Sequence, residues 1–182
     1  ADRLSECGFD LRLDADVDRT LTAGSIGEAA LAHLPVDDPY RPWAEDLAEG
    51  RFAIDLSGHL TGSIDLIARL RDEGDGTPRF VVSDYKSNRL HPAGHRPGPD
   101  DYGPDALVRA MVAHDYPLQA LLYSVALHRY LRWRVPDYDP AVHLGGVTYL
   151  FVRGMLPDVP AGSEDQPPGV ASWRIPSALI TE

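Results

Sequence analysis

The 182-residue sequence has little cysteine, little lysine and no long apolar run. Its one cysteine, Cys7, excludes a disulfide within the chain, a four-cysteine zinc site and an iron–sulfur cluster. We therefore expect an intracellular, reducing setting. No apolar stretch is long enough to cross a bilayer and no secretory signal precedes the first expected strand, so we expect no membrane contact.

Positive charge is also scarce, with 17 Lys and Arg residues against 28 Asp and Glu and a net charge of −11. Such a chain should bind nucleic acid weakly by itself, because phosphate binding usually depends on a basic surface. A metal-dependent nuclease is still allowed, since its centre needs carboxylates and the bound cation reverses the local charge. We expect a partner or another domain to deliver any DNA substrate.

Lys86 is the only lysine of a chain that uses arginine at every other basic position. Arginine presents a planar fork that stays charged, whereas lysine presents a compact ammonium whose pKa can be tuned. One retained lysine therefore favours a site that needs a compact ammonium.

Hydrophobic patterning predicts an α/β fold, with a central mixed sheet of about five strands flanked by helices. Strands are expected over residues 7–13, 59–70, 80–85, 147–152 and 170–175. Helices are expected over residues 29–34, 42–48, 106–114 and 117–134, the first of them after a Ser25–Glu28 capping box. Strict alternation along 59–70 would put Ile64 and Ile67 on opposite sides. The whole chain, 1–182, is expected to form one domain.

Asp84 and Lys86 are two residues apart, so their side chains project from the same face of the strand expected there. Asp65 lies 19 residues earlier (84 − 65), across a hairpin loop, and can be brought opposite Asp84. Two carboxylates and a lysine suit metal-dependent phosphodiester hydrolysis, because Mg²⁺ prefers oxygen ligands and lysine can orient water or offset phosphoryl charge. The plain alternative is a surface ion pair between Asp84 and Lys86.

Gln119 and Tyr123 share one face of the expected long helix, and Tyr116 continues that stripe. Their spacing alone favours a surface glutamine beside a half-buried core tyrosine over a functional pair. At the end of the same helix, the helix dipole accounts for most of the arginines, with one or two free to contact a DNA backbone. Those arginines are Arg129, Arg132 and Arg134. We expect the three tryptophans, Trp43, Trp133 and Trp173, to lie in the core or at a subunit interface rather than to serve as base-stacking platforms.

A family resemblance is carried by three segments: Gly-Ser-Ile-Asp at 62–65, Asp-Tyr-Lys-Ser-Asn at 84–88 and Gln-Ala-Leu-Leu-Tyr at 119–123. They resemble the motifs of the PD-(D/E)XK nuclease superfamily, in its RecB-type branch. The stretch 128–155 is similar to the C-terminal nuclease domain of the helicase–nucleases of that branch, the exodeoxyribonuclease V type. The resemblance extends from about residue 58 to residue 155.

The resemblance implies a restriction-endonuclease-like core, truncated at the N-terminus, with a Mg²⁺ site formed by Asp65, Asp84 and the backbone carbonyl of Tyr85. Lys86 would be the catalytic lysine, and Gln119 and Tyr123 would support the site and contact DNA. It further implies a fragment of a bacterial cytoplasmic, nucleoid-associated helicase–nuclease subunit. That subunit would act on single- and double-stranded DNA with RecC and RecD in double-strand break repair by homologous recombination, and would take part in loading RecA.

One departure from the pattern concerns a metal-binding histidine that RecB-type nucleases carry on a helix before the first strand. This chain begins almost at that strand, and neither His33 nor His59 lies in the matching context. A second hypothesis is therefore a docking module for RecA or RecC with little nuclease activity. A third, a nuclease of the iron–sulfur type, is disfavoured by the single Cys7.

Overall fold

The computed structural model describes residues 2–12, 21–50, 55–56, 58–71, 74, 76–96, 98–155 and 167–182. Five strands form one sheet in the order β1-β4-β5-β6-β7, in which only β5 and β6 run parallel. This confirms the predicted α/β class and the mixed sheet of five strands. The strands are β1 (Arg3–Arg12), β4 (His59–Arg71), β5 (Pro78–Lys86), β6 (Leu144–Phe151) and β7 (Val170–Trp173). Residue 13, the expected end of the first strand, lies outside the described residues.

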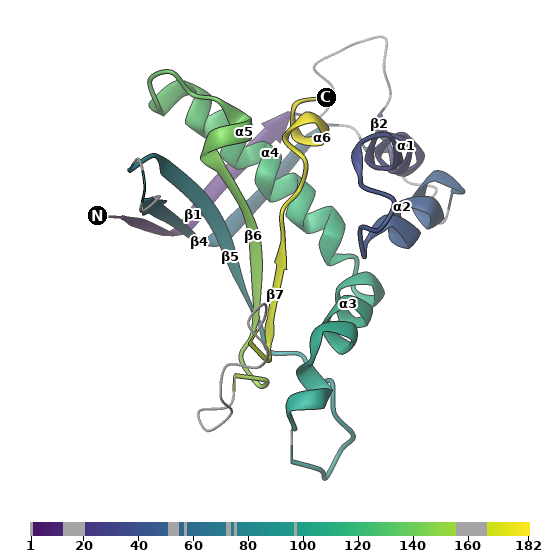
Figure 1. The fold of residues 1–182 in the computed structure, drawn as a ribbon. Coiled ribbons are helices and arrows are strands. Elements are labelled where there is room, and N and C mark those ends of the chain that lie inside the picture. The colour runs from purple at the N-terminus through teal and green to yellow at the C-terminus, as the bar shows by residue number, and fades with distance from the viewer. Residues whose placement is uncertain are drawn as a thin grey trace.

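The helices include one long element, α4 (Tyr116–Arg134), which runs diagonally across the sheet in Figure 1. The helices predicted over 42–48, 106–114 and 117–134 are confirmed, with boundaries that shift by one or two residues. Four short elements were not predicted, namely η1, α5 and the two paired strands β2 and β3. The remaining elements are β2 (Leu21–Thr22), α1 (Ala23–His33), α2 (Arg41–Ala48), β3 (Asp55–Leu56), the 3₁₀ helix η1 (Pro99–Tyr102), α3 (Pro104–Ala113), α5 (Pro140–His143) and α6 (Ser177–Thr181).

The connection from β5 to β6 determines where α4 lies. Two parallel neighbouring strands need a crossover, which here consists of η1, α3, α4 and α5. A crossover helix packs back onto the sheet beside the strands that it joins. The N-terminal half of α4 is thereby brought over the C-terminal end of β5, where the Asp84 and Lys86 side chains begin.

Helix α1 begins earlier than predicted, and its cap is a different residue. The Thr22 hydroxyl accepts a hydrogen bond from the Ser25 amide (3.1 Å), and the Ser25 hydroxyl accepts one from the Thr22 amide (3.0 Å). Ser25 therefore closes the capping box instead of opening it, so the prediction of Ser25 with Glu28 was wrong. Gly27 lies inside the helix because α2 packs against it: a Cβ there would be 2.4 Å from the Ala48 backbone nitrogen.

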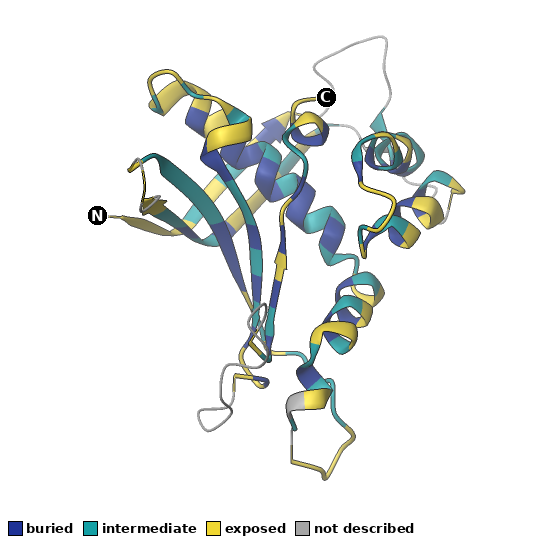
Figure 2. Cartoon of the chain, viewed as in Figure 1, coloured by how far each residue is buried: buried dark blue, intermediate teal, exposed yellow. Residues whose placement is uncertain are grey.

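The core lies between the sheet and the helices, and Figure 2 shows the buried residues on the facing sides of α4 and the strands. Trp43 and Trp173 are 0% and 5% exposed, as predicted for core residues. Trp133, near the end of α4, is 90% exposed, so of the two places predicted for it the core is wrong and the subunit interface stays a prediction. No helix in the described part of the chain is long and apolar enough to cross a membrane.

Candidate functional site

Asp65 lies at an interruption in the pairing of β4 on both of its sides. Towards β1, the register passes from Ser5↔Leu66 to Cys7↔Ile64, and the intervening Glu6 has a φ of 52°. Towards β5, the described pairing ends at Leu66↔Ser83. The predicted strict alternation also fails here, because Ile64 and Ile67 are both buried, at 2% and 4% exposure. Such irregularities bend a strand and re-aim its side chains, and they are frequent beside active sites.

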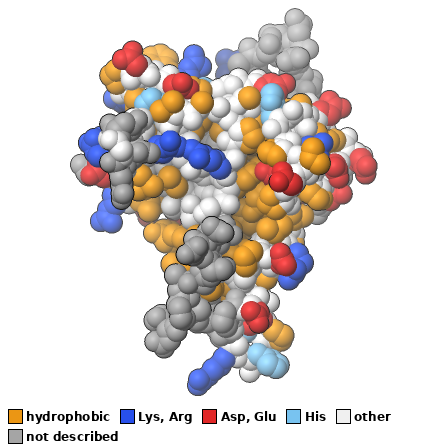
Figure 3. Space-filling model, in the orientation of Figure 1, with side chains coloured by type: hydrophobic (Ala, Val, Ile, Leu, Met, Phe, Trp, Pro, Cys, Tyr) orange, Lys and Arg blue, Asp and Glu red, His pale blue; other side chains and the backbone are white. Residues whose placement is uncertain are grey.

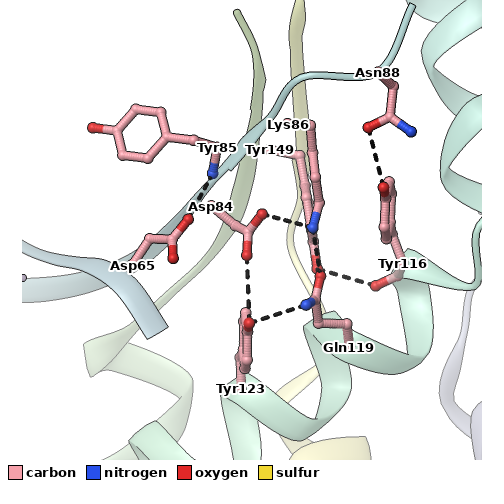
Figure 4. A network of polar contacts seen from close by, with 9 residues as sticks. All are labelled: Asp65, Asp84, Tyr85, Lys86, Asn88, Tyr116, Gln119, Tyr123 and Tyr149. Atoms are coloured by element: carbon pink, nitrogen blue, oxygen red, sulfur yellow. Dashed lines mark hydrogen bonds and ion pairs between the residues drawn. The ribbon is translucent and has the colours of Figure 1, made fainter. Parts of the chain in front are cut away.

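The separation of β4 from β5 leaves the Tyr85 amide available to the Asp65 side chain. That amide donates a hydrogen bond to Asp65 Oδ2 at 3.1 Å. The Tyr85 side chain itself is exposed and points away from the other labelled residues (Figure 4). Asp65 is thus held next to the backbone that carries Asp84 and Lys86.

Asp84 and Lys86 form an ion pair with 2.7 Å between Lys86 Nζ and Asp84 Oδ2. The Asp84 side chain is 5% exposed and that of Lys86 is 12% exposed. The pair is therefore buried, which overturns the alternative of a surface ion pair. Burying two charges is costly unless further hydrogen bonds satisfy them, so the surroundings of this pair decide its role.

Helix α4 supplies those hydrogen bonds through Gln119 and Tyr123 (Figure 4). Gln119 Oε1 accepts from Lys86 Nζ at 2.9 Å, and Gln119 Nε2 donates to the Tyr123 hydroxyl at 3.0 Å. The Tyr123 hydroxyl donates in turn to Asp84 Oδ1 at 3.4 Å. The side chains of Asp84, Lys86, Gln119 and Tyr123 thus form a closed ring of polar contacts. The prediction from spacing alone, that Gln119 is a surface residue without a role in the site, was wrong.

Two further tyrosines line the other side of the lysine ammonium. Lys86 Nζ lies 4.0 Å from the centroid of the Tyr116 ring and 5.1 Å from that of Tyr149, and the two rings stack at 5.5 Å. The Tyr149 hydroxyl lies 3.1 Å from Gln119 Oε1 and 3.1 Å from the Tyr116 carbonyl oxygen, and it can donate a hydrogen bond to either. The Tyr116 hydroxyl donates to Asn88 Oδ1 at 3.1 Å. A cation is stabilised by the faces of such rings.

Sequence reasoning left Tyr116 undecided and missed Tyr149. Tyr149 lies directly beside Asp84 in the parallel β5–β6 register. That pairing joins residues 65 apart in the chain (149 − 84), so no local spacing reveals it. The only available signal was the position of Tyr149 within the segment that carries the family resemblance.

The electrostatics of the site are those of crowded negative charge. Burial raises the pKa of the Asp84 carboxyl above its ordinary value, and the neighbouring Asp65 carboxylate raises it further, although Lys86 and Tyr123 act in the opposite direction. Burial and the same two carboxylates raise the pKa of Tyr123 to about 12, so its hydroxyl stays protonated and donates to Asp84. Burial, together with Asp84, also raises the pKa of Tyr149.

The donor set fits a hard divalent cation. The Asp65 carboxylate raises the pKa of the buried Asp84 carboxyl, so a cation between them would be favoured, and Mg²⁺ is usually held by one or two carboxylates, with water and substrate oxygens completing the shell. The part of the chain that the structure describes has no group of three or more His, Cys, Asp or Glu side chains placed to hold a metal. Glu6 lines a hollow of about 310 Å³ with Asp65 and Tyr85.

The histidines set aside in the sequence analysis lie elsewhere. His33 Nε2 is 2.6 Å from Glu182 Oε2, and His59 Nδ1 is 2.8 Å from Asp10 Oδ1. Both are engaged by carboxylates outside the ring of Asp84, Lys86, Gln119 and Tyr123. Neither histidine completes the site.

Comparison with known proteins gives one consistent result. The chain is 43% identical over 183 residues to the RecBCD enzyme subunit RecB of Mycolicibacterium smegmatis, and 44% identical over 184 residues to that of Mycobacterium tuberculosis. Each alignment covers 98% of this chain and 16% of the relative. The subunit of the same name from Escherichia coli is 48% identical over 102 residues, which are 55% of this chain and 8% of the relative. No protein-family model matches the chain.

Proposed function

Since the chain is homologous to the RecB subunit of RecBCD enzymes over nearly its whole length, we propose that it forms a Mg²⁺-dependent deoxyribonuclease domain. It spans about one sixth of the length of the mycobacterial relatives, at 16% of each. The observation that carries the proposal is the buried Asp84–Lys86 pair, held beside Asp65 where two strands separate and closed over by Gln119 and Tyr123.

In this proposal Asp65, Asp84 and the backbone carbonyl of Tyr85 would hold Mg²⁺, which would lower the pKa of water and offset negative charge on the phosphate. Lys86 orients the attacking water or stabilises charge on the phosphoryl oxygens. Gln119 fixes the ammonium by accepting its hydrogen bond, and its own amide is oriented by Tyr123 and Tyr149. Tyr123 holds the second oxygen of Asp84.

The partners follow from the relatives, which are subunits of RecBCD enzymes. We propose that the domain hydrolyses phosphodiester bonds in DNA as part of a bacterial cytoplasmic assembly with RecC and RecD. Double-strand break repair by homologous recombination, with delivery of the single strand to RecA, is the corresponding process. The net charge of −11 supports delivery of DNA by other parts of that assembly rather than tight binding by this chain.

Cleavage of single-stranded DNA tests the proposal. The purified chain is incubated with a labelled oligonucleotide in Mg²⁺ and in EDTA, in parallel with Lys86→Ala and Arg89→Ala. Arg89 is a matched control, because it is an exposed cation three residues beyond Lys86. We expect cleavage that requires Mg²⁺, that Lys86→Ala abolishes and that Arg89→Ala leaves within a few-fold of the parent.

Circular dichroism of each variant shows whether it is folded. Cleavage that survives in folded Lys86→Ala would refute the assignment of the lysine. A folded parent chain that cuts no DNA in Mg²⁺ or Mn²⁺ would instead favour the docking-module hypothesis.

A further inference from the structure

The last two turns of α4 carry an exposed surface of aromatic and basic side chains that the proposed site does not use. Trp133 is 90% exposed and Tyr130 is 41% exposed. Three exposed arginines surround them, and the Arg134 guanidinium lies 5.7 Å from the centroid of the Tyr130 ring. We call this set the α4-end surface; its members are Arg129, Tyr130, Arg132, Trp133 and Arg134.

This surface continues the face of α4 that reaches the proposed site. Tyr123, Tyr130 and Trp133 follow Gln119 at spacings of four, seven and three residues, so they lie on one side of the helix. The sheet covers the first part of that side, where Tyr123 packs edge-on against Phe9 of the edge strand β1. Tyr123 is 7% exposed, but Tyr130 and Trp133 are open. The side of α4 that is buried in the site at Tyr123 is therefore exposed to solvent at Trp133, ten residues later.

The charges of the α4-end surface are free to meet a polyanion. In the ranges that the structure describes, none of its three arginines forms an ion pair. In Figure 3, basic side chains lie along the upper edge and the left of the molecule, and acidic ones gather at the right over α1 and α2, with a few more at the upper left, towards which α4 runs in Figure 1. A favourable helix dipole accounts for positive charge at a helix C-terminus, but it does not account for an exposed tryptophan between arginines.

From these observations we propose that the α4-end surface binds single-stranded DNA, with a base stacked on Trp133 and the arginines on the flanking phosphates. Proteins that bind single strands without sequence preference combine cationic side chains with aromatic rings in this way. The proposal rests on the proposed nuclease function and names a second contact for its substrate. The helix separates Gln119 from Trp133 by 14 residues, or about 21 Å at a rise of ~1.5 Å per residue. A stacked strand of roughly six nucleotides, at ~3.4 Å each, spans that distance.

Tryptophan fluorescence gives a direct measurement, because the other two tryptophans, Trp43 and Trp173, are buried. The chain is titrated in EDTA, which prevents cleavage, with an oligothymidylate of about twelve nucleotides. We expect quenching in the parent, and no quenching in Trp133→Phe although that variant keeps a ring and still binds. Binding, followed by the anisotropy of a labelled oligothymidylate, should weaken about tenfold in Trp133→Ala.

The arginines are tested by their effect on salt dependence. Each of Arg129→Gln, Arg132→Gln and Arg134→Gln should lower the slope of log affinity against log salt by up to about 0.7. Arg174→Gln, an exposed arginine beyond β7, is the matched control and should leave the slope unchanged. In cleavage assays, Trp133→Ala should raise KM about tenfold for the longer oligonucleotide. It should leave KM unchanged for one of about four nucleotides, which cannot reach from the site to Trp133.

The outcomes separate this inference from the proposed function. If the chain cleaves DNA through Lys86 but the oligothymidylate neither quenches Trp133 nor binds less tightly to Trp133→Ala, the α4-end surface is not a DNA contact and the nuclease proposal stands. Quenching without any cleavage supports the surface and refutes the nuclease proposal. Quenching by polyglutamate but not by oligothymidylate would overturn the inference in favour of an acidic protein partner.

Discussion

Tyr149→Phe removes one hydroxyl from the centre of the candidate site and tests whether the site depends on a fixed orientation of Gln119. The Tyr149 side chain is fully buried, and its hydroxyl lies 3.1 Å from Gln119 Oε1. That oxygen also accepts from Lys86, so the tyrosine helps to determine which end of the amide faces the ammonium. Phenylalanine keeps the ring and its stacking with Tyr116 and loses only the hydroxyl, which lies 3.1 Å from Gln119 Oε1 and from the Tyr116 carbonyl oxygen.

The expected magnitudes follow from the one proton that the hydroxyl donates, which its two acceptors share. A buried neutral hydrogen bond contributes about 1 kcal/mol to the free energy of unfolding, which corresponds to about 2–4 °C in Tm for a chain of this size. If the same ~1 kcal/mol is lost from the positioning of Lys86 in the transition state, kcat falls about fivefold. KM should stay unchanged, since a residue with no exposed surface cannot touch DNA.

Thermal unfolding and steady-state cleavage by Tyr149→Phe are compared with those by Tyr138→Phe. The Tyr138 hydroxyl is bonded to His128 Nδ1 at 3.1 Å, away from the site, so its removal should cost similar stability and leave kcat intact. Parent-like kcat in Tyr149→Phe, with the same loss of stability, would refute the positioning role. A rise in KM with constant kcat would also contradict the reasoning, because it would mean that the hydroxyl acts on DNA binding.

Three further predictions concern charge, pH and packing. Lys86→Met should lower the free energy of unfolding in EDTA by about 3 kcal/mol, because it leaves the Asp84 carboxylate buried without its ammonium; Lys86→Arg should recover part of the stability in urea denaturation but none of the cleavage. Burial, and to a lesser degree the charges of Arg132 and Arg129, lower the pKa of His128 below 6.5. The folded chain therefore binds a proton at His128 less readily than the unfolded chain does. The contribution of His128 to the free energy of unfolding is present above about pH 6.5 and is lost as the pH falls below that value. His128→Gln should therefore flatten the acid side of a plot of urea midpoint against pH, and an unchanged slope would exclude His128 as a cause. Gly27→Ala should destabilise the chain by about 1–3 kcal/mol, because its Cβ would lie 2.4 Å from the backbone of α2, whereas Gly24→Ala, with nothing nearer than 3.7 Å, should melt at the parent's temperature or above.

Local patterns were sufficient for most of the fold. Helix α4 has long apolar periodicity and a proline in its first turn, and its predicted start at residue 117 is one residue from the observed start. The start of α1 failed, because Ser25 and Glu28 have capping-box spacing while the residue that caps the helix is Thr22. The box that forms instead pairs Thr22 with Ser25, and the pattern of a Ser or Thr followed three residues later by Glu or Gln does not include that pair.

The candidate site was predictable to the extent that its residues are close in sequence. Asp84 and Lys86 share a strand face by their spacing, and the structure brings Asp65 and Gln119 to them. The pairing of Asp84 with Tyr149 depends on a parallel crossover, which no short-range pattern encodes. The burial of the ion pair was equally hidden, because an Asp-x-Lys triplet has the same spacing on a surface as in a core. The exposure of Trp133 was hidden in the same way, because large aromatic side chains are usually buried and only the structure shows that this one is exposed.

The two proposals share one rigid element, and this constrains the substrate. Helix α4 holds Gln119 and Tyr123 in the candidate site and Trp133 at its exposed end, with no loop between them. The distance between the two contacts is therefore determined by helix geometry and does not adjust to the ligand. Binding energy from Trp133 then becomes available only to strands long enough to span about 21 Å, so the preference should appear as a step in affinity with oligonucleotide length. A gradual rise in affinity with length would instead indicate non-specific attraction of phosphates by scattered arginines.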